Sequence, residues 1–172
     1  MTKQGLTLLE LLMVLVMLSV LMGAATLGFI TVLKTWGNQD ISLEIQEDVR
    51  QGVERMLRDL RPARAISVSD DAIRYTVRES GTNNHYIFYL YHPADSWIPA
   101  YNQSVYELRK ATLSGGINGT FTYGSGTLYA KKVKPPPTSD MSSSGNVITI
   151  DLTVSRYDET FHLLEKIRPR NL

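Results

Sequence analysis

The carboxylate of Glu10 is the first side chain in this sequence whose position calls for a chemical explanation. Residues 11–33 contain no charged side chain, and Lys34 ends that run. A helix of this length, rising about 1.5 Å per residue, is about 34 Å long and crosses a hydrocarbon core of about 30 Å. An ionised acid near the centre of a bilayer costs at least about 2.5 kcal/mol and is usually paired. Glu10 therefore lies either at the membrane interface or opposite a positive charge.

The other residues with catalytic or metal-binding potential form no recognisable set. His85, His92 and His162 lack the spacing of a metal site, and the chain contains no cysteine. Neither a phosphate-binding loop nor a nucleophile elbow is present. Asp140, in a Ser-rich stretch, could join a calcium site, but one acid is too few. We expect no enzyme activity, no cofactor and no metal.

The residues that precede the apolar run form a processing signature. Lys3 belongs to a short basic stretch that ends at Gly5, Leu6 is apolar, and Glu10 follows four positions later. This pattern resembles the prepilin peptidase signature of type IV pilins and of the pseudopilins of type II secretion. In that family a membrane protease cuts after the Gly and methylates the new N-terminus. The resemblance implies a cut between Gly5 and Leu6, although the first mature residue of the family is more often Phe.

The resemblance also implies a role for Glu10. In that family the acid is thought to meet the N-terminal amine of the neighbouring subunit as it enters the fibre. A carboxylate in a dry environment is stable only with a countercharge, so such a pair would set the register between subunits. The implied partners are other major and minor pilins or pseudopilins, the prepilin peptidase, the inner-membrane assembly platform and membrane lipid.

Two further stretches narrow the resemblance. Residues 57–61, Leu-Arg-Asp-Leu-Arg, and the ending Arg168-Pro169-Arg170-Asn171 resemble minor pilins of the PilW type and J-type minor pseudopilins. The resemblance implies a minor subunit that helps initiate or cap a type IV pilus or a type II secretion pseudopilus. Such a subunit is a single-pass inner-membrane protein with its C-terminal domain in the periplasm, and it then joins a filament at the cell surface or in the envelope.

Two alternatives remain open. A signal-anchored envelope binding protein would display a β-rich domain without assembling into filaments. An ordinary secretory signal peptide would be cut near Gly23-Ala24-Ala25, but an acid is unusual at the start of its apolar region. Glu10 favours assembly, because an anchor that never assembles has no use for it.

The charge balance argues against nucleic acid as a partner. The chain has 18 basic and 17 acidic residues, and loss of Lys3 with a leader would leave the two equal. The run Lys131-Lys132-Val133-Lys134 is either a contact for a partner or for DNA, or a basic strand edge that resists aggregation. We expect no nucleic acid.

Beyond Lys34 the pattern predicts an amphipathic helix that Pro62 ends. One apolar stripe recurs at helical period, with charged residues including Asp59 on the other faces. Gly23, Gly28, Gly37 and Gly52 each weaken a helix by about 1 kcal/mol relative to Ala and are candidate sites of bending or local melting. The stripe consists of Val49, Val53, Met56, Leu57 and Leu60.

The remaining sequence predicts an antiparallel sheet. Strands are expected at 65–69, 73–77, 86–91, 105–113, 127–133, 147–155 and 161–167, with Asp70-Asp71 as a hairpin turn. Loops are expected at 92–103, 115–126 and 134–146. The alternating strand 147–155 has an apolar face that the stripe can cover.

The expected fold is therefore α+β and pilin-like, with a long N-terminal helix packed on an antiparallel sheet. Residues 1–5 are expected to form the leader and residues 6–33 the transmembrane and filament-core half-helix. Residues 34–61 are expected to form the amphipathic half-helix, and residues 62–172 the β-rich periplasmic or extracellular domain.

Overall fold

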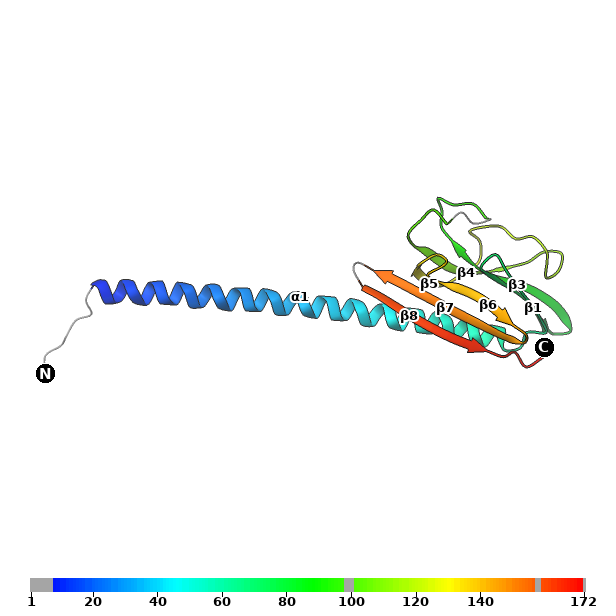
Figure 1. Ribbon diagram of the computed structural model, residues 1–172, viewed down its shortest axis with the longest axis horizontal. Helices are drawn as coiled ribbons and strands as arrows, with labels where there is room; N and C mark the ends of the chain where they lie inside the picture. Colours follow the sequence, from blue (N-terminus) through cyan, green and yellow to red (C-terminus); the bar gives the residue numbers. More distant parts are fainter. Residues whose placement is uncertain (1–7, 98–100, 157–158, 172) are drawn as a thin grey trace. The chain divides into compact units, whose positions relative to one another are not determined.

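The computed structural model describes residues 8–97, 101–156 and 159–171, leaving out the side chains of 37–42 and 45. The expected α+β fold, a long N-terminal helix followed by an antiparallel sheet, is confirmed (Figure 1). Two compact units divide the chain, one ending at Leu43 and one spanning Glu44–Leu172. The elements are α1 Leu8–Leu60, β1 Ala65–Ser69, β2 Ala72–Glu79, β3 Thr82–Tyr91, β4 Tyr106–Thr112, β5 Thr127–Val133, β6 Asp140–Ser144, β7 Val147–Arg156 and β8 Glu159–Ile167.

The strands form one sheet in the order β1-β2-β3-β4-β5-β7-β6, and β8 pairs with the other edge of β7. Asp70 and Asp71 join β1 to β2, both at a φ of 53°. Two successive left-handed residues make the tight turn whose twist matches that of a hairpin, so the predicted turn is confirmed. The strands expected at 65–69 and 127–133 have the bounds of β1 and β5.

The prediction of a loop at 134–146 is wrong for the second half of that range. Strand β6 lies there and pairs with the start of β7, with Met141 opposite Ile150 and Ser144 opposite Val147. Met141 is its one apolar residue and is buried. Three serines and an aspartate carry no hydrophobic pattern, so backbone pairing with β7 decides the conformation. Asp140 is therefore an exposed residue at the start of a strand, outside any loop.

The apolar stripe of α1 forms the core together with the sheet. Val49, Val53, Met56 and Leu60 are each at most 1% exposed, whereas Leu57 is only half-buried. The predicted apolar face of β7 is also buried, with each of its four side chains at most 1% exposed; they are Ile148, Ile150, Leu152 and Val154. The second half of α1 thus belongs to the folded domain.

Gly52 brings α1 into contact with the backbone of β5. A Cβ at this position would lie 2.1 Å from the carbonyl oxygen of Tyr129. Tyr129 is the extra residue of a bulge, because Leu108 pairs with Ala130 and Arg109 with Leu128. Helix α1 is continuous through all four glycines. The interpretation of Gly52 as a site of melting is therefore wrong: glycine permits this contact.

Asp59 connects the end of α1 to the sheet through hydrogen bonds. Its Oδ2 atom accepts hydrogen bonds from Lys110 Nζ at 2.7 Å and from the Tyr129 hydroxyl at 2.6 Å. The prediction that Asp59 belongs to the solvated face of the helix is therefore wrong. Burial, together with the hydrogen bond to Asp59, raises the pKa of the Tyr129 hydroxyl above its usual value, so the hydroxyl remains a donor.

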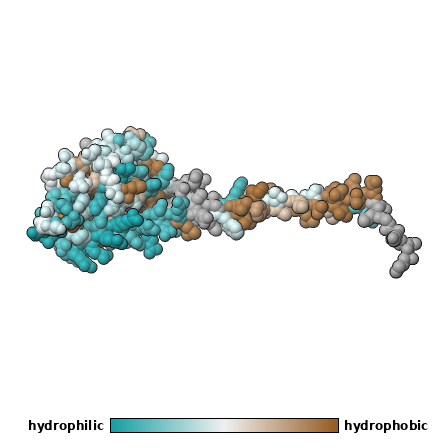
Figure 2. All heavy atoms as spheres, turned by 180° about the vertical axis from the view of Figure 1, so that it is seen from behind, coloured by the Kyte–Doolittle hydropathy of each residue, from teal (hydrophilic) through white to brown (hydrophobic). Residues whose placement is uncertain are grey.

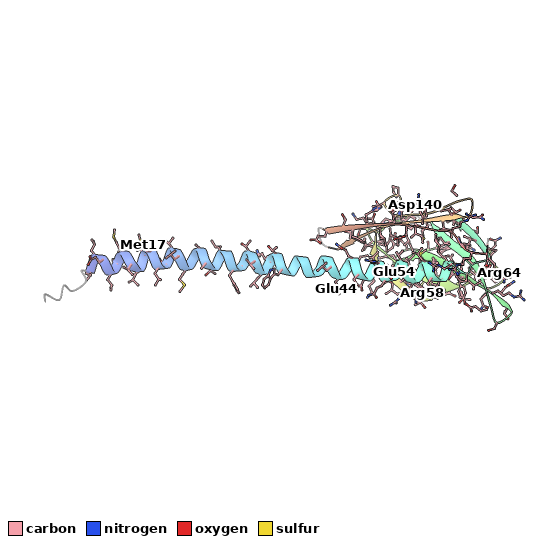
Figure 3. All side chains as sticks on the ribbon, turned by 90° about the horizontal axis from the view of Figure 1, so that it is seen from below. Met17, Glu44, Glu54, Arg58, Arg64 and Asp140 are labelled. Carbon is pink, nitrogen blue, oxygen red and sulfur yellow. The ribbon has the colours of Figure 1, made fainter. Side chains whose placement is uncertain are left out.

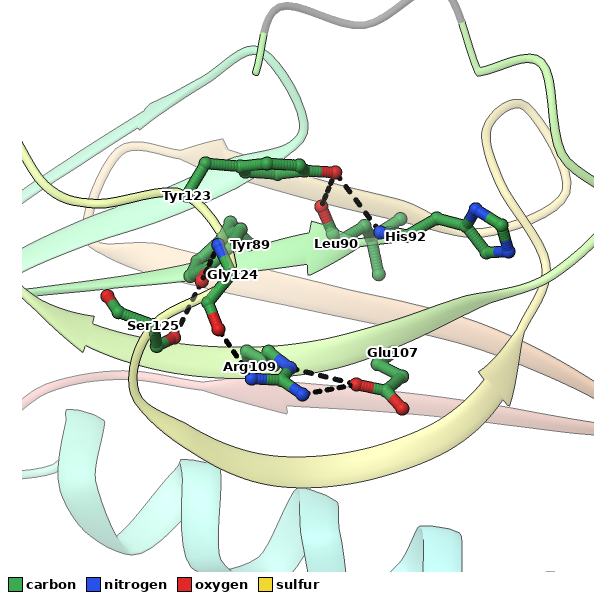
Figure 4. Close-up of polar contacts among 8 residues, drawn as sticks. All are labelled: Tyr89, Leu90, His92, Glu107, Arg109, Tyr123, Gly124 and Ser125. Atoms are coloured by element: carbon green, nitrogen blue, oxygen red, sulfur yellow. Dashed lines mark hydrogen bonds and ion pairs between the residues drawn. The ribbon is translucent and has the colours of Figure 1, made fainter. Parts of the chain in front are cut away.

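The opposite face of the sheet is covered by loops with aromatic side chains. Tyr89 contacts Phe121 at 4.7 Å and Trp97 at 5.9 Å between ring centroids. Polar contacts hold the loop at 122–126 in place (Figure 4). The Tyr89 hydroxyl donates to the carbonyl of Ser125 at 2.7 Å, and Arg109 donates to that of Gly124, also at 2.7 Å. The sequence also predicts loops at 92–103 and 115–126. None of the strands β1–β8 includes a described residue of these two segments.

The close contact at Gly52 predicts a position-specific cost for added volume. Gly52→Ala should lower the free energy of unfolding by about 1–2 kcal/mol, because a clash with backbone outweighs the gain in helix propensity of about 1 kcal/mol. Thermal unfolding of the full chain in detergent measures this as a loss of several degrees in Tm. Gly28→Ala is the matched control, since its Cβ would meet nothing within 4 Å. Equal melting temperatures for both variants and the wild type would contradict the contact.

The buried stripe predicts where the domain can be shortened. The fragment Glu44–Leu172 should be soluble and folded without detergent, because it keeps the stripe and the sheet together. The fragment 64–172 should aggregate, because it bares the apolar face of β7. Size-exclusion chromatography and circular dichroism distinguish the two. A monomeric 64–172 fragment with the same Tm as the longer one would show that the helix is only a spacer.

Candidate functional site: the apolar N-terminal helix

The first part of α1 exposes an apolar surface over its whole length. Leu8–Trp36 has a mean hydropathy of 2.4 in its most apolar window, and none of that window is buried. It is long and apolar enough to cross a membrane. Figure 2 shows hydrophobic residues along the described helix, in contrast to the mainly hydrophilic face of the domain. Such a surface is stable when lipid or other apolar helices cover it.

The polar side chains of this segment are compatible with a hydrocarbon environment. Ser19, Thr26, Thr31 and Thr35 each donate a hydrogen bond to the backbone carbonyl three or four residues earlier, at 2.7–3.0 Å. These are all the hydroxyl side chains between Leu8 and Trp36. An unsatisfied polar group in hydrocarbon costs several kcal/mol, so the internal bonds remove this cost for the four hydroxyl groups.

Glu10 is exposed on the first turn of α1. The backbone amides at a helix N-terminus carry about half a positive charge, which stabilises a nearby carboxylate by about 0.3–1 kcal/mol. The helix itself thus supplies part of the favourable environment that the acid requires. Gly5 and Leu6 lie outside the described residues, so the structure leaves their role in processing as a prediction.

The three histidines are engaged in separate local contacts. His85 Nδ1 lies 2.8 Å from the Thr76 hydroxyl, and His162 Nε2 lies 2.5 Å from Asp151 Oδ1. His92 Nδ1 accepts from the backbone of Ala94 at 3.2 Å. Within the described ranges there is no group of three or more acidic, histidine or cysteine residues placed to hold a metal ion. Asp140 lies opposite Asp151 in the β6–β7 pairing, and the Oδ1 atom of Asp151 already contacts His162.

A groove of about 240 Å³ lies between α1 and β5, beside Gly52. Its charged lining residues are Asp48, Arg55 and Lys131. Paired carboxylates or a histidine next to a nucleophile are the usual acid–base arrangements, and the lining residues provide neither. The groove therefore suggests no catalytic reaction.

Comparison with known proteins bears on the N-terminal segment. Residues 1–26 match the family described as the prokaryotic N-terminal methylation motif. No curated protein and no solved structure gives a significant match to the chain. The matched segment includes Gly5, Leu6 and Glu10 and runs into the apolar helix. The chain therefore carries the prepilin signature of type IV pilins at its N-terminus, which supports a protein of the pilin or pseudopilin type.

Proposed function

We propose that this chain is a minor pilin or pseudopilin, a structural subunit that helps initiate or cap a type IV pilus or a type II secretion pseudopilus. The observation that carries the proposal is the methylation motif at residues 1–26, followed directly by a helix that can span a membrane. Proteins with this motif are structural subunits, and the motif implies processing by the prepilin peptidase and assembly with other pilins. The minor role rests on the resemblance of residues 57–61 and 168–171 to such subunits.

The proposed organisation follows the change of environment along the chain. Residues 1–5 are removed as a leader, and residues 6–33 anchor the subunit in the inner membrane and later line the filament core. Residues 34–61 form the amphipathic half-helix, whose buried stripe belongs to one folded unit with residues 62–172. That unit lies in the periplasm and then on the filament. The apolar helix with internally bonded hydroxyls supports an inner-membrane anchor.

Glu10 is the proposed register residue of assembly. It lies on the first turn of α1, directly before an uncharged and mainly apolar stretch that extends to Leu33, so packing this stretch among other helices transfers the carboxylate to a dry environment. The N-terminal amine of a neighbouring subunit offers the countercharge that such a carboxylate requires. Only one axial position brings the two charges together, and the pair therefore selects one register. A signal-anchored binding protein that never assembles places no such demand on Glu10.

Processing between Gly5 and Leu6 is the first test. Mass spectrometry of the mature protein should find N-methylated Leu6 as the first residue. Gly5→Glu should remain uncut in the inner membrane, because a side chain at this position obstructs entry to the protease site. Gln4→Ala serves as the control that should be cut normally. A mature chain that begins at Ala25 or Thr26 would identify an ordinary signal peptide and refute the proposal.

The second test separates assembly from anchoring. Glu10→Ala should be cut and retained in the membrane, yet its recovery in sheared filaments should fall by a factor of at least about 100. Leaving one member of a buried charge pair alone costs about 3–5 kcal/mol, which accounts for that factor. Glu54→Ala, which removes an exposed acid in the second half of α1, should assemble normally, and Glu10→Asp should show a partial defect. Equal recovery of Glu10→Ala and wild type would leave Glu10 without a role in assembly.

A further inference from the structure

Folding gathers five arginines at the end of the domain where α1 stops. The C-terminal tail returns to the end of the helix: the backbone amide of Arg170 donates to the Arg61 carbonyl at 3.1 Å, and Asn171 Nδ2 donates to the Pro62 carbonyl at 3.2 Å. Figure 3 labels Arg58 on the last turn of α1 and Arg64 just beyond it. The side chains of all five arginines are exposed. We call the surface that they form the arginine pole; its members are Arg58, Arg61, Arg64, Arg168 and Arg170.

The arginine pole has no ion-pair partner in the part of the domain that the structure describes. Among the residues that the structure describes, none of its five guanidinium groups makes an ion pair, whereas Arg50 and Arg109 pair with Glu54 and Glu107. Asp59, next to Arg58 in sequence, is held by Lys110 and Tyr129 instead. The C-terminal end of the helix offers about half a negative charge, which offsets only a small part of five positive ones.

A complementary acidic surface lies farther back along the same helix. Glu44, Glu47 and Asp48 are exposed and fall within five consecutive residues that include no basic side chain; we call residues 44–48 the acidic segment. Asp48 at its end also lines the groove that contains Arg55 and Lys131. Because α1 begins at Leu8, these acids gain nothing from the positive end of the helix dipole. Ten residues separate Asp48 from Arg58, a distance of about 15 Å along the axis. One domain therefore presents opposite charges at two separate places.

We propose that the arginine pole binds the acidic segment of a second copy of this chain. A contact between two different surfaces leaves one of each free on the outer copies, so it can repeat along a filament. Guanidinium groups bind carboxylates through paired hydrogen bonds, which gives the contact direction as well as strength. The proposal rests on assembly into a filament as proposed above. For a minor subunit, it implies that at least two copies lie next to each other where the filament is initiated or capped.

A second copy fits the arginine pole better than nucleic acid does. Surfaces that bind single strands place aromatic side chains among the basic ones, and the pole consists of arginines without an aromatic member. Domains that bind duplexes are usually strongly basic, whereas this chain has a pI of about 7.9 and nearly equal numbers of acids and bases. The acidic segment on the same helix offers the arginine pole a partner of opposite charge.

Cross-linking of full-length chains in membranes tests the contact directly. The chain has no cysteine, so introduced cysteines report a single pair of positions. One tagged copy carries Arg64→Cys in the arginine pole, and a differently tagged copy carries Gln46→Cys in the acidic segment. Mild oxidation should join the two copies. A copy with Asn83→Cys, an exposed position at the start of β3, is the control that should not be joined to Arg64→Cys.

Charge reversal then establishes whether complementarity drives the contact. Replacing Arg58, Arg61 and Arg168 by Glu should reduce the cross-link at least tenfold, as should replacing Glu44, Glu47 and Asp48 by Arg. The chain that carries both sets should recover the cross-link, because the two surfaces have exchanged sign. All replaced side chains are exposed, so unchanged Tm values should accompany these losses. Raising the salt concentration to 0.5 M should lower the yield of the cross-link between copies without charge reversals, since salt screens the attraction between exposed charges.

The outcomes separate this inference from the proposed function. Processing at Gly5 and recovery in filaments are measured in the same cells. Suppose that processing and assembly are normal and that neither charge reversal changes the cross-link yield. This result would overturn the proposed contact of the arginine pole and leave the pilin proposal intact. An unprocessed chain that still cross-links in a charge-dependent manner would overturn the pilin proposal alone. Retention of the full chain on duplex DNA that depends on the pole, without any cross-link between copies, would overturn the inference in favour of a nucleic acid partner.

Discussion

Burial of one stripe of α1 against the sheet is the constraint on which the domain depends. Val49, Val53, Met56 and Leu60 lose nearly all contact with solvent, and each such burial contributes about 1.5–3 kcal/mol. A domain has only about 5–15 kcal/mol of stability in total, so these few side chains decide whether it folds. Gly52 lets the helix approach β5, and Asp59 holds its end through Lys110 and Tyr129. The same helix that continues into the apolar segment is therefore part of the core of the domain.

Covering both faces of the sheet limits the surfaces left for partners. The helix covers one face, and the aromatic loops around Tyr89 cover the other. Hydrogen bonds from Tyr89 and Arg109 hold the loop at 122–126, so its rings act as a second small core. The exposed side of the helix and the arginine pole remain accessible. Among the described strand residues, Leu164 in β8 remains exposed, whereas most large apolar side chains of the sheet are buried.

The two halves of α1 suit two environments through different chemistry. In the first half, exposed apolar side chains and hydroxyls bonded to the backbone match hydrocarbon, where an acid such as Glu10 is tolerated only with favourable electrostatics. In the second half, charged side chains match water, where exposed charges interact weakly and are screened by salt. A charge pair near Glu10 would act in a dry environment and define register, whereas contacts of the arginine pole would act in water and guide orientation.

The sequence alone determined the features that depend on neighbours along the chain. The uncharged run, the helical period of the stripe, the alternation in β7 and the turn at Asp70-Asp71 each follow from local spacing, and the processing motif occupies adjacent residues. Only the tertiary structure decided the role of Gly52, the partners of Asp59, the strand β6 and the gathering of the arginines. Each depends on a contact between distant residues: Gly52 with Tyr129, Asp59 with Lys110, β6 with β7, and Arg61 with Arg170. Hydrophobic period predicts which face is buried, but it contains no information about which distant backbone or charge will lie opposite that face.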